Sequence, residues 1–146
     1  MHRAVSLIAA LALASLLAAA PALGKTRLPS RSFVKLTKVD LVDVGAAGDS
    51  VGDMVVFTFQ VFERNGGRRI GAGHGYCDRT EVGIASDCLA NTSLPGGRIV
   101  LQWEEHDGQR VSRAAIIGGT GGYLSVSGQM RLTSLSPTEV STGAGS

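Results

Sequence analysis

The chain has 146 residues, of which 44% are hydrophobic and only 5% aromatic, and its formal net charge is +2 at neutral pH. That length supports one hydrophobic core and excludes two independent domains of ordinary size. With 14 basic and 12 acidic side chains, the charge balance gives no reason to expect a nucleic acid as a partner.

Residues 1–24 have the three parts of a secretory signal peptide: Arg3 near the start, an apolar run over residues 4–20, and a small-residue cleavage site at residues 22–24. We therefore expect a mature chain that begins at Lys25 and is secreted or periplasmic. An uncleaved membrane anchor is the alternative, although the alanine-rich run has the length of a signal core. No later segment is apolar enough to span a membrane, so no stable membrane insertion is expected after cleavage.

A basic arm over residues 25–38 leads into the first predicted strand, because five cationic side chains precede any acid there: Lys25, Arg27, Arg31, Lys35 and Lys38. We interpret the arm as a solvated segment that follows the signal peptide. A lipid-binding or polyanion-binding tail is the alternative interpretation.

Strand patterns recur along the rest of the chain, whereas no window after Lys25 has sustained helical spacing with capping residues. Seven strands are predicted, over residues 33–44, 53–64, 68–81, 87–94, 98–104, 110–117 and 123–134. Turn-forming residues such as Asn65-Gly66-Gly67 and Asp107-Gly108 separate them. The sequence therefore predicts an all-β protein, and between a barrel and a sandwich we favour an antiparallel up-and-down β-barrel.

The strand over residues 53–64 carries an apolar stripe on one face, formed by Val55, Phe57, Phe59 and Val61. In the next strand, Gly71, Gly73, Gly75 and Cys77 share one face, while His74, Tyr76 and Asp78 lie on the other. A strand face with almost no side chains indicates close approach of another group to the backbone. That group is an aromatic side chain, another chain or a ligand.

Cys77 and Cys88 lie in two neighbouring predicted strands whose bend falls near residues 82–85. Antiparallel pairing would bring them opposite each other, so we predict a disulfide, as is usual in exported proteins. A free thiol in a pocket is the alternative.

Other chemistry finds little support in the sequence. The glycine-rich segment over residues 117–123 is predicted as a turn between two strands, because it lacks the spacing and the following helix of a phosphate-binding loop. His74 and His106 lie on separate elements, so we expect no metal site. No cofactor is expected either. Trp103 is interpreted as a core residue, and Glu104, Glu105 and Asp107 as a solvated hairpin tip, from their places beside an Asp-Gly turn.

Three segments together resemble the allene oxide cyclase and dirigent superfamily, most of all exported microbial allene-oxide-cyclase-like barrel proteins: residues 51–57 (VGDMVVF), residues 69–77 (RIGAGHGYC), and residues 117–123 (IGGTGGY) with Gly128. The resemblance covers residues 39–132. It implies an eight-stranded antiparallel barrel with an apolar cavity, commonly assembled as a homotrimer. In that superfamily, plant cyclases close an unstable fatty-acid epoxide into a cyclopentenone, and dirigent proteins steer the coupling of phenoxy radicals.

The resemblance also implies candidate site residues. The cyclases use a glutamate in the first strand and dirigent proteins an aspartate, and this chain has Asp40 and Asp43 there. Strict alternation places Asp40 on the same face as Val34 and Leu36, where an acid can donate or accept a proton in an apolar setting. The alternative is a position at the barrel rim, in water. The cysteine-like position of the cyclases is occupied by Cys77.

The resemblance does not decide the structure of the C-terminal segment, because residues 134–146 are small and turn-like where the family has a closing strand. We expect a barrel domain over residues 39–134 and a flexible tail over residues 135–146. Within that tail, residues 138–142 either form a short eighth strand or leave an edge that a neighbour or the basic arm covers.

The sequence thus predicts an exported barrel that binds a small apolar or aromatic molecule and steers its cyclisation or coupling. Asp40 and Asp43 are the predicted catalytic residues, and Phe57, Phe59 and Tyr76 the predicted ligand-binding residues. Any enzymatic activity would be of an isomerase or cyclase type without a cofactor. The alternative is a non-enzymatic structural or interaction protein with a solidly packed barrel.

Overall fold

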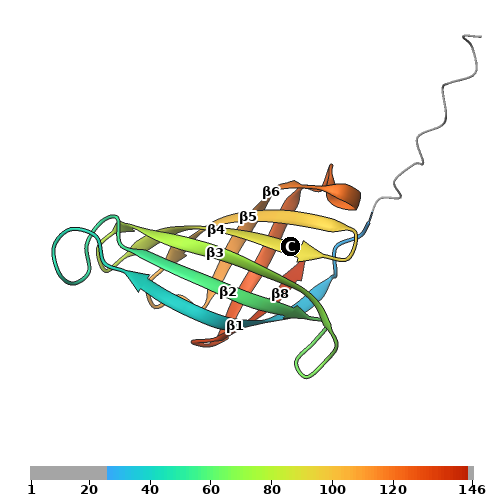
Figure 1. The fold of residues 1–146 in the computed structure, drawn as a ribbon, viewed down its shortest axis with the longest axis horizontal. Helices are drawn as coiled ribbons and strands as arrows, with labels where there is room; N and C mark the ends of the chain where they lie inside the picture. The colour runs from blue at the N-terminus through green and yellow to red at the C-terminus, as the bar shows by residue number, and fades with distance from the viewer. Residues whose placement is uncertain (1–25, 145–146) are drawn as a thin grey trace, which may run out of the picture.

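The computed structural model describes residues 26–144, and the predicted signal peptide lies outside them. Eight antiparallel strands follow one another around a closed barrel, each paired with its neighbours in the sequence (Figure 1). The strands are β1 (Arg31–Val42), β2 (Met54–Phe62), β3 (Arg69–Glu81), β4 (Ala85–Leu94), β5 (Gly97–His106), β6 (Val111–Gly119), β7 (Gly128–Ser136) and β8 (Glu139–Ala144). The predicted all-β, up-and-down barrel is therefore confirmed.

Strand β8 closes the barrel, within the segment that the sequence predicts to be a tail. It pairs with β7 on one side and, from Lys35↔Glu139 to Arg31↔Gly143, with the start of β1 on the other. Of the two alternatives for the C-terminal segment, a short eighth strand or an open edge, the short eighth strand is therefore confirmed. Its six residues are small or β-branched for the most part, which suits a strand even though their hydrophobicity is low.

The second half of β1 has a strand neighbour on one side only. Its pairing with β8 ends near Leu36, whose N–H donates to the carbonyl of Thr138, whereas its pairing with β2 continues to Val42. Val39 and Leu41 face the same side of the sheet as the cavity-lining residues of β2, yet they are 49% and 73% exposed. The barrel wall is therefore open beside the second half of β1.

The glycine-rich segment before β7 forms a short 3-10 helix over Gly121–Tyr123, so residues 124–127 are not part of the strand that the sequence predicts from Tyr123 onward. The segment turns back over the β4–β5 turn, where the N–H of Gly122 donates to the carbonyl of Gly96 and the Tyr123 hydroxyl to that of Pro95. These tertiary hydrogen bonds override the alternating pattern of the local sequence. Tyr123 is buried as a result, and Leu124 is exposed.

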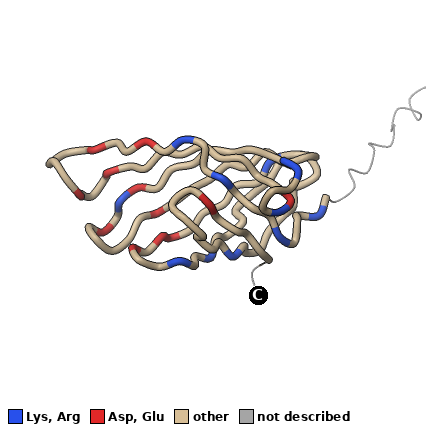
Figure 2. The backbone as a smooth tube through the Cα atoms, turned by 90° about the horizontal axis from the view of Figure 1, so that it is seen from below, with Lys and Arg blue, Asp and Glu red and all other residues tan. Residues whose placement is uncertain are grey.

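Charge is distributed unevenly along the barrel, with most acidic side chains at one end and most basic side chains toward the other (Figure 2). Successive turns of an up-and-down barrel alternate between its ends. The turns after β1, β3 and β5 share one end, where Asp49, Asp107 and Glu81 at the last position of β3 lie, whereas the turn after β2 carries Arg64 and Arg68 at the other. We call these the acidic end and the basic end.

Candidate functional site

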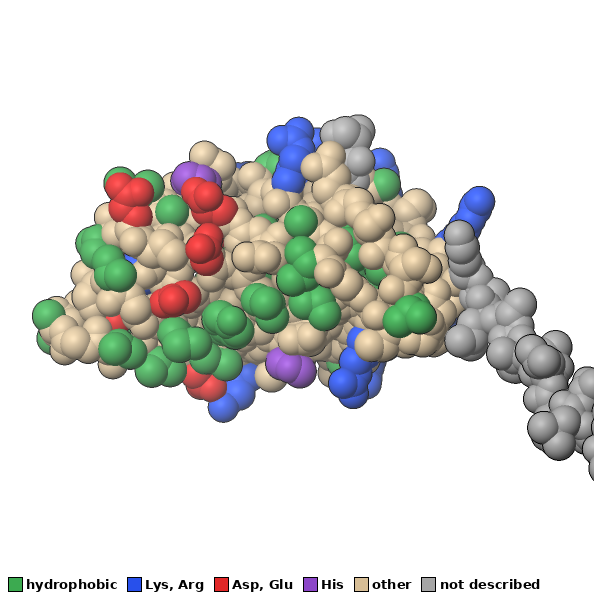
Figure 3. All heavy atoms as spheres, turned by 90° about the horizontal axis from the view of Figure 1, so that it is seen from above, with side chains coloured by type: hydrophobic (Ala, Val, Ile, Leu, Met, Phe, Trp, Pro, Cys, Tyr) green, Lys and Arg blue, Asp and Glu red, His purple; other side chains and the backbone are tan. Residues whose placement is uncertain are grey.

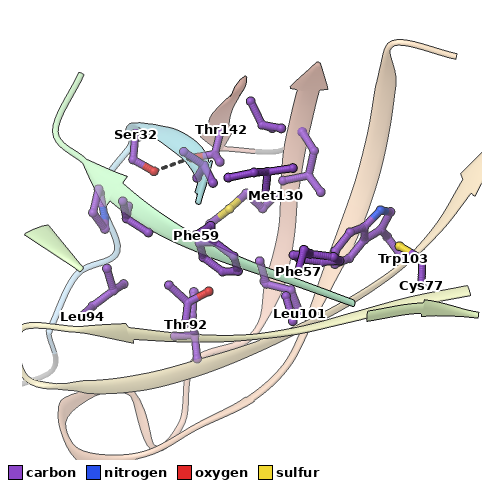
Figure 4. Close-up of a pocket in the computed structure, with 18 of the residues that line it drawn as sticks. Ser32, Phe57, Phe59, Cys77, Thr92, Leu94, Leu101, Trp103, Met130 and Thr142 are labelled. Atoms are coloured by element: carbon purple, nitrogen blue, oxygen red, sulfur yellow. Dashed lines mark hydrogen bonds between the residues drawn. The ribbon is translucent and has the colours of Figure 1, made fainter. Parts of the chain in front are cut away.

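The barrel interior contains a cavity of about 250 Å³. Its wall is apolar apart from three hydroxyl groups, and side chains from nearly every strand contribute to it (Figure 4). The lining residues are Pro29, Ser32, Val34, Leu36, Val55, Phe57, Phe59, Val61, Cys77, Ala90, Thr92, Leu94, Ile99, Leu101, Trp103, Met130, Leu132, Val140 and Thr142. The core is thus not packed solid, in contrast to the usual close packing of small protein interiors.

Phe57 and Phe59 line the cavity as the sequence predicts, and their ring centroids are 6.1 Å apart. They lie over the glycine face of β3, because register pairs Phe57 with Gly75 and Phe59 with Gly73. A Cβ atom added at Gly75 would be 2.7 Å from the Phe57 ring, and one added at Gly73 would overlap the Phe59 ring. The group that approaches the glycine backbone is therefore a pair of aromatic rings from the neighbouring strand.

The predicted disulfide is present between Cys77 of β3 and Cys88 of β4, which are directly opposite each other in the register. Cys88 is almost completely buried, and Cys77 lines the cavity near Phe57 and Trp103 (Figure 4). The cross-link therefore forms part of the cavity wall. The alternative of a free thiol in a pocket is excluded.

Three hydroxyl side chains supply the polar part of the wall. Ser32 on β1 and Thr142 on β8 share a hydrogen bond of 2.6 Å across the seam that closes the barrel. Thr92 is buried and lies on β4, on the same face as Cys88. Sequence reasoning missed all three residues, although alternation from Cys88 to Ala90 and Thr92 is a signal that could have found Thr92.

Trp103 also lines the cavity, and its indole N–H donates to Glu105 at 2.9 Å. The same carboxylate oxygen accepts a hydrogen bond of 2.8 Å from the hydroxyl of Ser112 on β6. Glu105 is therefore a partly buried residue on the inner face, and its interpretation as part of a solvated hairpin tip is wrong. Alternation from Leu101 through Trp103 places it there, whereas the neighbouring Asp-Gly turn suggested a solvated loop.

Beyond the cavity, an ion-pair cluster ties two turns together at the acidic end. The guanidinium group of Arg79 lies 2.9 Å from carboxylate oxygens of both Asp49 and Asp107. Asp53 accepts hydrogen bonds from the backbone N–H groups of Val44 and Ser50, each at 2.8 Å, and these bonds lower its pKa. The β1–β2 loop is thus held at this end of the barrel.

The structure places both predicted catalytic aspartates away from the cavity. A β-bulge shifts the register of β1 between Leu36 and Lys38, so that residues after it change faces. Asp40 consequently points outward, where it pairs with the ammonium group of Lys38 at 2.7 Å, and its side chain is 51% exposed. Asp43 follows the end of β1 and is also exposed. The sequence reasoning assumed uninterrupted alternation and therefore assigned Asp40 to the wrong face.

Tyr76 likewise lies outside the cavity. It is opposite Val56 in the register, on the outer face, and it is 40% exposed. The reason is that the glycines and Cys77 occupy the inward positions of β3, so the larger side chains between them point outward. Figure 3 shows exposed apolar side chains along this side of the barrel, next to acidic side chains near the acidic end.

Over residues 26–144, no group of three histidine, cysteine, aspartate or glutamate side chains is arranged to hold a metal ion. In the same range, no helix has the length and apolar character needed to cross a bilayer.

No protein-family model matches the chain, and no curated protein matches it. Solved structures do. A pyocyanin demethylase superposes with a TM-score of 0.68 at 27% identity, over 77% of this chain and 94% of that one. An exo-specific intermolecular Diels-Alderase gives a TM-score of 0.60 at 13% identity, over 76% and 88%. A pterocarpan synthase dirigent protein gives a TM-score of 0.61 at 13% identity, over 77% and 81%.

These superpositions show that the chain shares the overall fold of the three structures. Identities of 13% support a shared fold and nothing finer. The chain therefore has a closed eight-stranded barrel whose fold is shared with a dirigent protein, in agreement with the resemblance of its sequence motifs.

Proposed function

We propose that the protein binds a small apolar or aromatic molecule inside the barrel and steers its cyclisation or coupling. The observation that carries this proposal is the cavity of about 250 Å³ with its apolar wall. Ser32, Thr92 and Thr142 offer the polar contacts that orient a bound molecule. A solidly packed structural barrel, which is the other candidate, would not contain such a cavity.

The cavity volume limits the size of the ligand. An apolar cavity of about 150 Å³ is large enough for benzene, and pockets for drug-sized ligands begin at about 300 Å³. A cavity of about 250 Å³ therefore suits a compact molecule a little larger than a single ring. Its volume favours a compact aromatic ligand over a long acyl chain.

The affinity expected for such a ligand is modest. An aromatic group that buries roughly 200 Å² gains about 5 kcal/mol at 25 cal/mol per Å². That free energy corresponds to a Kd on the order of 0.2 mM. Hydrogen bonds to the three hydroxyl groups would improve on this value only for a ligand with matching polar groups.

Steering of a reaction is supported by the shape and chemistry of the site. A dry wall that holds one conformer of a reactive molecule lowers the entropic barrier without a catalytic acid. The three structural neighbours are a Diels-Alderase, a dirigent protein and a pyocyanin demethylase, and the similarity to them supports a small-molecule ligand. An activity of this kind needs no cofactor, and neither Asp40 nor Asp43 lines the cavity.

Trp103 gives a direct test of binding, because it is the sole tryptophan and lines the cavity. The mature chain is titrated with pyocyanin and with 4-nitrophenol, both of which quench tryptophan fluorescence. Ala90→Leu fills the cavity, and Ala115→Leu adds the same bulk at an exposed position on β6 as the matched control. We expect saturable quenching in the wild type and the control, and its loss in Ala90→Leu.

The proposal fails if the wild type shows no saturable quenching by either probe, or if Ala90→Leu binds as the control does. Circular dichroism and thermal melting establish that each variant is folded. If Ala90→Leu does not fold, Phe57→Leu replaces it: enlarging the cavity should then change the affinity for the two probes unequally, because they differ in size.

We further propose that the protein is exported and assembles as a homotrimer. A disulfide suits an oxidising compartment, and exposed apolar residues such as Val56 and Tyr76 give the outer face a surface for a second copy. Native mass spectrometry of the exported fraction tests both statements. It should find three chains that each begin at Lys25 and lack two thiol hydrogens.

A further inference from the structure

A second concave site lies on the outside of the barrel, at the basic end. It is an open groove of about 780 Å³ between the start of β1, strands β7 and β8, and the β2–β3 turn. Three arginines line it, namely Arg31, Arg64 and Arg131. Its chemistry is opposite to that of the apolar interior, and the function proposed for the cavity does not use its arginines.

The strand register places arginines in one row across the outer face. Arg31 on β1 is opposite Gly143 on β8, and Gly143 is opposite Arg131 on β7. Arg131 in turn is directly opposite Arg113 on β6. Since neighbouring strands are about 4.8 Å apart, the row extends over roughly 15 Å.

This arrangement is electrostatically unfavourable on its own. Like charges directly opposite each other in an antiparallel pair destabilise a sheet, as Arg113 and Arg131 do here. Glu63 is the acidic residue that lines the groove, and it is already paired with Arg68 at 2.5 Å. Within residues 26–144, none of the three groove arginines forms an ion pair.

The floor of the groove is left open between two of the arginines. Gly143 has no positive φ, and a Cβ atom added there would meet no atom within 4 Å. Neither backbone strain nor lack of space thus requires glycine at this position. Its effect is to leave room between the guanidinium groups of Arg31 and Arg131, whose forked donors match the oxygen atoms of phosphate.

We propose that this groove binds a ligand with several phosphate groups, through Arg31, Arg131 and Arg64. Arg31 and Arg131 are two strand spacings apart, or roughly 10 Å, which exceeds what one phosphate can contact, so a linear array of phosphates fits the groove better than a single ion. A soluble polyphosphate and a layer of phospholipid headgroups both have this chemistry. The groove shares Ser32 and Thr142 with the interior cavity, but none of its arginines lines that cavity, so each proposal can fail without the other.

The test compares two pairs of substitutions in the mature chain that remove equal charge. The groove pair is Arg31→Gln with Arg131→Gln, and the control pair is Arg69→Gln with Arg98→Gln, two exposed arginines of the basic end that do not line the groove. Tripolyphosphate binding is measured by calorimetry at low and at physiological ionic strength. Cosedimentation with phosphatidylcholine vesicles, with and without phosphatidylglycerol, distinguishes the two sources.

We expect the groove pair to weaken tripolyphosphate binding at least about tenfold, from the loss of charge-assisted hydrogen bonds, whereas the control pair changes it by less than roughly twofold. Gly143→Leu, which retains every charge but fills the floor, should weaken binding as well. Binding should fall with added salt. Cosedimentation only with vesicles that contain phosphatidylglycerol would identify headgroups as the source, and tripolyphosphate binding alone would identify a soluble polyphosphate.

Three results would overturn the proposal. The first is an absence of binding to both tripolyphosphate and anionic vesicles at low salt. The second is an equal loss of affinity in the two pairs, which would indicate a general charge effect. The third is self-association without any anion that the groove pair abolishes, because the groove would then hold an acidic face of a second copy. The outer row of Asp78, Asp87 and Glu104 provides such a face.

Discussion

Loss of the Cys77–Cys88 cross-link should destabilise the protein by an amount that follows from the length of the loop it closes. The two cysteines are 11 residues apart in sequence. The chain-entropy relation gives about 9.3 cal/mol/K for a loop of this length, or about 2.8 kcal/mol at 25 °C. For a domain of this size, that loss lowers Tm by roughly 11 °C.

Two samples separate the cross-link from the packing of its sulfur atoms. Reduced wild-type protein keeps both sulfur atoms in the cavity wall. It should therefore lose only the stabilisation that the cross-link provides by lowering the chain entropy of the unfolded state. The double variant Cys77→Ala with Cys88→Ala also leaves a small void beside Trp103, so we expect it to lose about 1 kcal/mol more. Both samples should have a larger denaturant m-value than the oxidised protein, because an uncross-linked unfolded chain exposes more surface.

The assay is equilibrium urea unfolding of the mature chain, with thiol content determined by mass spectrometry. The double variant should be insensitive to the reductant, which serves as the internal control. The reasoning would be refuted if fully reduced wild-type protein unfolded at the same urea concentration as oxidised protein. An unchanged m-value alongside a lower midpoint would also contradict the assignment of the effect to the unfolded chain.

Three further predictions follow from particular residues. Gly73→Ala would place a methyl group against the phenyl ring of Phe59 and should lower the free energy of unfolding by about 1–3 kcal/mol. The control Gly143→Ala should change that free energy by less than about 0.5 kcal/mol. Equal urea midpoints for the two variants would contradict the predicted difference. The lowered pKa of Asp53 stabilises the fold above the unfolded value of about 3.9 and ceases to do so as the pH falls through the folded value, so the stability difference between wild type and Asp53→Asn should shrink below about pH 4 in urea titrations. Asp40→Asn with Asp43→Asn should leave the affinity for 4-nitrophenol unchanged within roughly twofold, and a larger loss would show that these exposed acids reach the bound molecule.

Alternation was a reliable guide to the fold wherever strands ran without interruption. The apolar stripe of β2, the glycine face of β3 and the opposite positions of Cys77 and Cys88 all follow from a period of two residues. Strand β8 was not predicted with the other strands because its hydrophobicity is low. Its pairing depends on backbone hydrogen bonds to β1 and β7 more than on its own side chains.

The site was harder to predict because single local events decide which way a side chain points. One extra residue near Thr37 places Asp40 on the outer face of the barrel, and no pattern in the surrounding sequence predicts that bulge. For Glu105, the alternation that begins at Trp103 does predict an inward side chain. Its charge and the nearby turn nevertheless favoured the interpretation that it is exposed to solvent. The contact with Ser112 that stabilises it there comes from another strand.

The seam between β1 and β8 has a consequence for how the protein is made. The hydrogen bond between Ser32 and Thr142 joins residues 110 positions apart, so the first strand has no second neighbour until the last has been synthesised. Ring closure over such a distance is slow compared with hairpin formation. A nascent chain therefore cannot close the barrel until β8 has been synthesised. The delay would suit the export proposed above through a channel that passes unfolded chains.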